Sequence, residues 1–166
     1  MTIKNDDMMA IGDALMRKGW KLATAESCTG GLLAHGITSL PGCSRWYCGG
    51  VVAYADTTKT ALLGVPARLI LRDGAVSESV AAAMAQGAFE KMPEANIAVS
   101  ITGIAGPDGG CPDKPVGLVY VGLARAGEKA RTHKLQLEGT RSEIQIAAGN
   151  AALEMLYHAL SENESS

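Results

Sequence analysis

The chain has 166 residues, of which 47% are hydrophobic, only 4% aromatic and 19% charged. With 15 basic and 17 acidic residues the formal net charge is −2, so no positive field favours nucleic acid and we expect none as a partner. Acidic residues interrupt the apolar N-terminal segment, and no apolar run approaches the length of a membrane span. We therefore expect a cytoplasmic protein of one domain over residues 1–166, with a frayed tail from about residue 161, no membrane partner and a core built from aliphatic side chains.

The cysteines and histidines show no metal-binding pattern. The four cysteines include no C-x-x-C pair, and the three histidines are scattered along the chain. This distribution predicts no metal site, and it favours free thiols in a reducing compartment over disulfides.

The first third of the chain alternates between predicted helices and strands. Hydrophobic periodicity predicts a helix over 5–18, a strand over 20–25, a helix over 28–40, a strand over 49–55 and a helix over 57–63. Glycine follows the first and the last of these helices, as is typical of a helix C-terminus.

The rest of the chain contains one long helix, three strands and a final helix. Ser77 is the expected N-cap of the long helix over 78–92, which precedes a strand over 96–102. Two further strands, over 116–124 and 130–138, follow a loop rich in glycine and proline. The last helix opens at Thr140 with a capping-box pattern and runs to about residue 160.

This order of elements defines a fold class. Strands separated by helices favour parallel pairing, whereas the tight turn before the last strand requires an antiparallel pair. We therefore predict an α/β domain of three layers, α/β/α, with a mixed, mostly parallel sheet of about five strands.

Polar and glycine-rich residues follow three of the predicted strands, over 26–31, 54–59 and 102–110. Ligands of open α/β sheets bind at the carboxyl ends of the strands, so these three segments predict one shared site. The loop over 103–115 offers backbone N–H groups that could bind an anion, but it lacks the G-K-[ST] ending of a P-loop and is equally compatible with a plain mobile loop.

The stretch "ATAESCTGGL" contains the candidate nucleophiles. Ser27 lies at a predicted strand-to-helix corner, where unpaired N–H groups stabilise an oxyanion and Gly30 and Gly31 admit a substrate close to the backbone. Alternatively, Ser27 or Thr29 simply caps the helix, and the spacing alone favours the cap because it lacks the G-x-S-x-G pattern. Cys28 is a rival nucleophile or a small buried hydrophobe.

A serine nucleophile requires a base, and Lys59 is the better-placed candidate because His133 falls within an alternating strand. Lysine acts as a base only when burial or a nearby cation lowers its pKa; otherwise Lys59 is an exposed helical lysine. Tyr54 and Ser44 could relay protons or hold a carbonyl, or could serve in packing and capping. Arg141, in the first turn of the last helix, suits a phosphate or is a surface charge.

Four segments in the same order resemble one family. They are "TAESCTGG", "GCSRWYCGGVVAYADTTKTALLGV", "GAVSESV" and "TGIAGPDGGCPDKPVG". Together they resemble the CinA C-terminal domain family over nearly the whole chain, and in particular its stand-alone nicotinamide-nucleotide amidohydrolases. Longer family members carry an additional N-terminal domain, so we expect any pyrophosphatase activity of that domain to be absent.

The resemblance implies hydrolysis of nicotinamide mononucleotide to nicotinic acid mononucleotide and ammonia, in pyridine-nucleotide recycling, with no metal and no cofactor. By its motifs it implies Ser27 as nucleophile and Lys59 as base. It further implies supporting roles for Tyr54, Ser44 and Thr102, and a substrate or phosphate contact for Arg141. Cys43 and Thr102 depart from the expected serines, which puts only these two positions in doubt.

The implied mechanism also uses the backbone. N–H groups near Cys28, Thr29 and Gly30 are expected to hold the oxyanion, and Glu26 is a guess for the group that faces the cationic ring. The alternative function is a catalytically silent module that binds a nucleotide or a partner, and a third is hydrolysis of another amide or an ester.

The last helix also bears on oligomeric state. Its large apolar residues are spread around the predicted helix, which favours a homodimer or a higher homo-oligomer. These residues are Ile144, Ile146, Leu153, Leu156 and Leu160.

Overall fold

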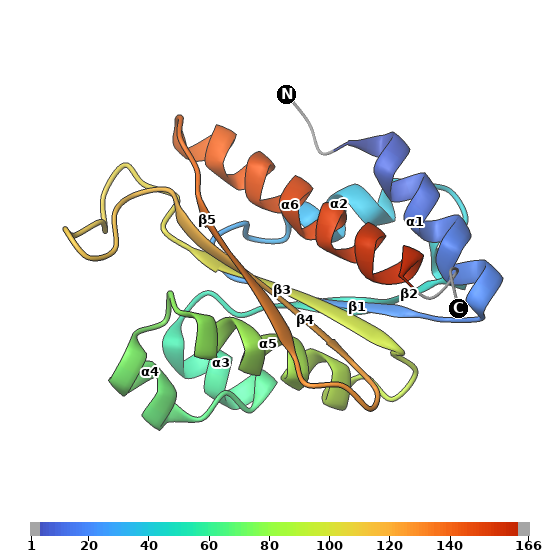
Figure 1. Cartoon of the computed structure of the whole chain (residues 1–166), viewed down its shortest axis with the longest axis horizontal. Helices are drawn as coiled ribbons and strands as arrows, with labels where there is room; N and C mark the ends of the chain where they lie inside the picture. Colours follow the sequence, from blue (N-terminus) through green and yellow to red (C-terminus); the bar gives the residue numbers. More distant parts are fainter. Residues whose placement is uncertain (1–3, 163–166) are drawn as a thin grey trace.

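The computed structural model describes residues 4–162, so residues 1–3 and 163–166, including most of the predicted tail, are outside this range. The chain forms a five-stranded sheet between two layers of helices (Figure 1). In sheet order the strands are β2 (Tyr47–Val52), β1 (Leu22–Glu26), β3 (Ile97–Gly103), β4 (Leu118–Arg125) and β5 (Arg131–Gln136). β1 pairs in parallel with both β2 and β3, whereas β3–β4 and β4–β5 are antiparallel. Four of the five strands therefore point the same way, which confirms the predicted fold class.

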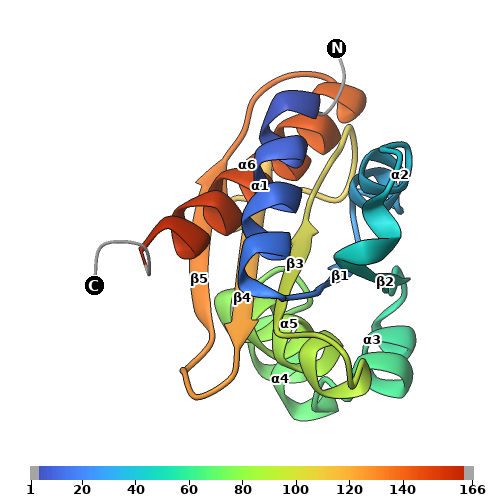
Figure 2. The ribbon, with the colours of Figure 1, turned by 90° about the vertical axis from the view of Figure 1, so that its right-hand side faces the viewer.

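The helices divide evenly between the two faces of the sheet, as the two perpendicular views show (Figures 1 and 2). One face is covered by α1 (Asn5–Lys18), α2 (Leu32–Thr38) and α6 (Arg141–Ser161). The other is covered by α3 (Asp56–Leu63), α4 (Ala67–Asp73) and α5 (Glu78–Lys91). Within residues 4–162, no helix has both the length and the apolar character needed to cross a membrane.

Small side chains allow the layers to approach closely. All five residues of β1 are buried, because helices cover both of its faces. A Cβ atom at Gly122 of β4 would lie 2.4 Å from the carbonyl oxygen of Ala81 in α5, so only glycine permits this helix to pack so near the strand. Aliphatic cores on both faces thus fix the central strands β1 and β3 rigidly in the molecule.

Three elements differ from the sequence prediction. α2 begins at Leu32 and not at residue 28, because Gly30 and Gly31 adopt φ values of 60° and 99°, which a right-handed helix does not allow. β2 lies two to three residues earlier than predicted. α4 was not predicted; it opens after Pro66, the residue at its N-cap.

The order β2-β1-β3 places a change of direction at β1. The chain moves from β1 to one edge of the sheet, forms β2, and then returns to the other side of β1 to form β3. A crevice forms where adjacent parallel strands lead to opposite faces of a sheet. β1 leads to α2 on one face and the adjacent β2 leads to α3 on the other, so the carboxyl ends of β1 and β2 are the expected place for a ligand.

Candidate active site

Ser27 lies at this change of direction. It directly follows β1, and its backbone N–H donates to the carbonyl oxygen of Ile101 in β3 at 3.0 Å. The residue is only 7% exposed. The serine is therefore held between the ends of two buried strands and not on a mobile loop.

Lys59 lies in the first half of α3, on the face of the sheet opposite to α2, and its side chain reaches the serine from that face. Its Nζ donates to Ser27 Oγ at 3.0 Å and to the carbonyl oxygen of Tyr54 at 2.9 Å. The residue is 1% exposed, which rules out the alternative that it is an ordinary surface lysine. The structure thus brings together the two residues, 32 positions apart in sequence, on which the sequence-based mechanism depends.

Two opposing effects act on the ammonium group. Burial lowers the pKa of Lys59 below its ordinary value of 10.5, because a charged amine loses its hydration. The Asp56 carboxylate, 3.9 Å from Nζ, raises the pKa of Lys59 and so opposes this effect. Because burial is the larger effect, the neutral amine that a base requires is more accessible here than in water.

Cys28 does not offer a comparable nucleophile. The residue is 4% exposed, and this burial raises the pKa of its thiol to about 12. A thiol in this environment stays protonated near neutral pH, so Cys28 is a small buried hydrophobe next to the serine.

Glu26 is the structural anchor of the turn after β1. Its carboxylate accepts hydrogen bonds from the Thr29 hydroxyl at 2.6 Å and from three backbone N–H groups at the start of α2, those of Gly31, Leu33 and Ala34. These four hydrogen bonds give Glu26 a structural role in the turn, and a contact between its carboxylate and the cationic ring stays a prediction. The carboxylate also replaces the predicted caps, because neither Ser27 nor Thr29 caps α2, whose N-cap is Gly31.

The turn leaves two backbone donors near the serine. Within residues 4–162, no hydrogen bond joins the N–H of Cys28 or of Thr29 to another residue. The N–H of Gly30, by contrast, donates to the carbonyl oxygen of Ser27 at 3.0 Å and is not available to a substrate. An unpaired N–H in a buried segment is rare in proteins, and at this position it is suited to a ligand oxygen.

Gly30 contributes through its conformation and its lack of a side chain. Its φ of 60° is in the left-handed region that favours glycine, and a Cβ atom there would meet no atom within 4 Å. The space beside the turn is therefore open on the side of Gly30, as access to Ser27 requires.

Tyr54 and Arg141 meet at the rim of the site. Arg141 donates to the Tyr54 hydroxyl at 2.9 Å and to the carbonyl oxygen of Gly106 at 2.7 Å. The Tyr54 side chain is 58% exposed, and Lys59 contacts its carbonyl oxygen, not its hydroxyl. Arg141 thus ties the glycine-rich loop to the segment after β2 and keeps further N–H donors of its guanidinium for a ligand.

The remaining two predicted residues differ in their placement. Thr102, at the end of β3, is buried, and its hydroxyl donates to the carbonyl oxygen of Ala75 at 2.9 Å. Ser44 lies in the short 3₁₀ helix Cys43–Arg45 that precedes β2, whereas Ser27 follows β1. Because β1 and β2 are parallel and Leu22 pairs with Tyr47 at their starts, Ser44 lies beyond the opposite end of these strands from Ser27, and the structure does not bring the two together.

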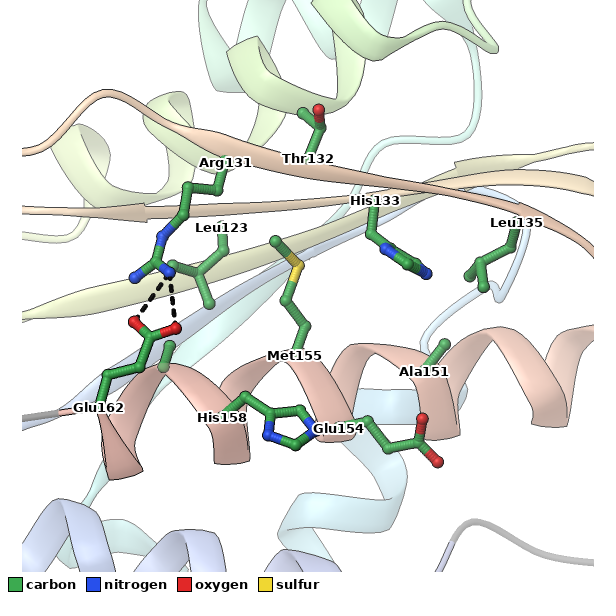
Figure 3. Close-up of a pocket in the computed structure, with 11 residues that line it drawn as sticks. Leu123, Arg131, Thr132, His133, Leu135, Ala151, Glu154, Met155, His158 and Glu162 are labelled. Carbon is green, nitrogen blue, oxygen red and sulfur yellow. Dashed lines mark hydrogen bonds and ion pairs between the residues drawn. The ribbon is translucent and has the colours of Figure 1, made fainter.

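No metal-binding cluster accompanies this arrangement. Among the described residues, no group of three or more His, Cys, Asp or Glu side chains is placed to hold a metal ion. A cavity of about 360 Å³ does exist elsewhere, between β5 and α6 (Figure 3). Met155 projects from α6 toward β5 in this cavity, and an ion pair between Arg131 and Glu162 closes one end. It shares no lining residue with the Ser27 site and lacks a nucleophile next to a base.

The apolar residues of α6 are used within the chain. Four of the five residues that favoured an oligomer are buried, and they are Ile144, Leu153, Leu156 and Leu160. They belong to the core cluster under α1 and α6, so the argument for a homodimer from an excess of apolar surface does not hold.

Fold and geometry together define a class: a three-layer α/β domain with a buried serine–lysine contact at the carboxyl edge of its sheet. The CinA C-terminal domain family matches residues 5–160, and the chain belongs to this family. The relatives are known by sequence and by structure.

Among curated relatives, a CinA-like protein of Mycolicibacterium vanbaalenii is 51% identical over 142 residues, which cover 86% of this chain and 33% of the relative. A CinA-like protein of Desulfotalea psychrophila is 47% identical over 88% of this chain and 35% of its own length. The chain therefore spans about a third of the length of these relatives.

Solved structures match over almost their whole length. The competence/damage inducible protein CihA from Agrobacterium tumefaciens has a TM-score of 0.90 and 38% identity, covering 97% of this chain and 98% of that chain. A CinA superfamily protein from Klebsiella pneumoniae has a TM-score of 0.90 and 32% identity, covering 95% and 98%. These names describe induction or similarity and not a reaction, so the chemistry has to be argued from the site.

Proposed function

We propose that this domain hydrolyses the carboxamide of nicotinamide mononucleotide to nicotinic acid mononucleotide and ammonia, with Ser27 as nucleophile and Lys59 as base. The observation that carries the proposal is the buried 3.0 Å contact between Lys59 Nζ and Ser27 Oγ. A lysine that is desolvated beside a serine has the pKa direction a general base needs. The choice of substrate comes from the family resemblance.

The first half of the reaction transfers the acyl group to the enzyme. Neutral Lys59 accepts the hydroxyl proton of Ser27 while Oγ attacks the carboxamide carbon, and the carbonyl oxygen becomes an oxyanion. The N–H groups of Cys28 and Thr29, which donate to no other described residue, stabilise that oxyanion. The Lys59 ammonium then protonates the leaving nitrogen, so the C–N bond breaks, ammonia departs and the Ser27 ester of nicotinic acid mononucleotide remains.

The second half reverses these proton transfers. Lys59, neutral again, accepts a proton from water, whose oxygen attacks the ester carbon, and the ammonium returns a proton to Ser27 Oγ. The carbonyl oxygen of Tyr54, 2.9 Å from Nζ, keeps the amine in place in both halves. Arg141 at the rim is suited to the substrate phosphate, because a guanidinium forms paired hydrogen bonds with phosphate oxygens.

The test is release of ammonia from nicotinamide mononucleotide by the purified chain, beside Ser27→Ala and Lys59→Met. Both variants should lose turnover while retaining the fold, and the wild-type rate should fall at low pH as Lys59 becomes protonated. Two exposed residues, in Ser39→Ala and Lys134→Met, provide matched controls that should keep the wild-type rate.

The outcomes separate the alternatives. Turnover retained by Ser27→Ala would move the nucleophile elsewhere, and a panel of other nicotinamide compounds, amides and esters would reveal a different substrate. No turnover by the folded wild type on any of them would favour a nucleotide-binding or partner-binding module, to be tested by titration with the same nucleotide.

A further inference from the structure

Gln145, in α6, contacts the turn over residues 27–31, which carries Ser27 and which we call the catalytic turn. It lies four residues after Arg141 in α6, so both side chains leave the same face of the helix. The Gln145 amide nitrogen donates to the carbonyl oxygen of Cys28 at 2.8 Å, across 117 positions of sequence. Gln145 is outside the four family motifs, and the proposed reaction steps do not use its side chain.

The bonded carbonyl belongs to the peptide group that carries one of the unpaired donors. The peptide between Cys28 and Thr29 is trans, so its C=O and its N–H point in opposite directions. Gln145 draws the carbonyl toward α6, and the Thr29 N–H consequently points away from α6. The contact with Gln145 therefore fixes the direction of that donor.

The base that contacts the serine also comes from the side away from α6. Ser27 Oγ is bonded to Lys59 of α3, and α3 covers the face of the sheet opposite to α6 (Figure 1). The hydroxyl of Thr29 is bonded to Glu26 on the other side of the same residue, which prevents the peptide from rotating. The peptide group before Thr29 is thus held by Gln145, and the side chain of Thr29 is held by Glu26.

We propose that Gln145 is a positioning residue that aims the Thr29 N–H at the oxyanion formed on attack by Ser27. The inference rests on the proposed function, because an oxyanion forms only if Ser27 is the nucleophile. It predicts that the loss of Gln145 lowers the rate of the chemical step and leaves ground-state binding of the substrate largely unchanged, since the oxyanion exists only in the transition state.

The test uses Gln145→Met, which keeps the length of the side chain and removes its N–H donor. Loss of a whole oxyanion donor lowers kcat by about 100- to 1,000-fold, so a donor that is present but misdirected should lower kcat by about tenfold or more, with KM changed less than about twofold. Gln145→Asn retains an amide, but its side chain is one methylene shorter and does not reach Cys28, so this variant should show the same loss of kcat as Gln145→Met.

A second readout does not depend on the substrate. A fluorophosphonate reacts with an activated serine and places its P=O oxygen at the oxyanion position, so its rate of labelling, followed by intact mass, should fall in parallel with kcat. The matched control is Gln136→Met. Gln136, on β5, also donates a side-chain amide hydrogen bond to a backbone carbonyl, that of Val116 at 2.8 Å. This control should label and turn over like the wild type.

The two readouts distinguish failure of this inference from failure of the proposed function. If the wild type is labelled at Ser27 and both Gln145 variants, folded by circular dichroism, are labelled equally fast, the positioning role is refuted and the nucleophile stands. If the wild type itself is not labelled at Ser27, the proposed function and the inference both fall. A rise in KM at constant kcat would instead assign Gln145 to substrate binding and overturn the inference.

Discussion

Replacement of Glu26 by glutamine tests whether the catalytic turn is held by its carboxylate. Three donors converge on Oε2, and the N–H of Ala34 alone bonds Oε1 at 2.8 Å. Glutamine has one acceptor oxygen, which best replaces Oε2, and its NH₂ group then faces the N–H of Ala34. The part-buried N–H of Ala34 loses its acceptor and faces the donors of the new NH₂ group, and the other three hydrogen bonds lose the assistance of a charge.

The size of the effect follows from these bonds. An unpaired buried donor costs about 1–3 kcal/mol, and with the weakening of three charged hydrogen bonds we expect Glu26→Gln to destabilise the fold by about 3–5 kcal/mol. For a domain of this size that lowers the thermal midpoint by about 6–20 °C. Turnover should fall as well at temperatures where the variant is folded, because the same turn carries Ser27 and Thr29.

The assay is thermal unfolding by circular dichroism, with ammonia release measured well below the midpoint. Glu138→Gln makes the same chemical change at an exposed position and should leave the midpoint unchanged. An unchanged midpoint in Glu26→Gln would refute the view that the carboxylate holds the turn and the start of α2. A lowered midpoint with full turnover would show that the carboxylate stabilises the fold but does not set the geometry of Ser27 and Thr29.

Two further predictions concern charges around the site. Asp56→Asn removes a carboxylate that raises the pKa of Lys59, so that pKa should fall further. More of the amine is then neutral at low pH, and the acidic limb of the pH–rate profile should move to lower pH. A limb that stays in place or moves to higher pH would contradict this coupling. Arg141→Met should raise KM for nicotinamide mononucleotide by about tenfold or more but leave KM for nicotinamide riboside, which lacks the phosphate, within about twofold; equal changes for both would argue against a phosphate contact.

Much of the fold was predictable because its elements carry local information. The bounds of α1, the Ser77 cap of α5 and the capping box of α6 all follow from residues next to each other in sequence. α4 was missed because seven residues after a proline give too short a pattern to be recognised. The start of α2 was misplaced because the preference of two glycines for positive φ competes with the helical pattern around them.

The site was predictable only in part, because its key contacts are long-range. The sequence indicates Ser27 and Lys59 as chemical types, but the burial that separates a base from a surface lysine depends on how α3 packs in its helical layer, against α4 and α5. The roles of Glu26 and Gln145 depend on which carbonyl or N–H group lies opposite each side chain, and no spacing in the sequence carries that information. Ser44 shows the reverse case: it is near Tyr54 in sequence, but it precedes β2 and Tyr54 follows it, so the two residues lie at opposite ends of that strand.

The burial of Lys59 and its contact with Ser27 arise only when the chain folds. In an unfolded chain this lysine is hydrated and protonated at neutral pH, and Ser27 is an ordinary alcohol. The contact forms only after β3 has bonded the backbone of Ser27 and α3 has brought Lys59 to its hydroxyl. Under the proposed mechanism, a chain still emerging during synthesis has no activated serine, and turnover would report on completion of the site.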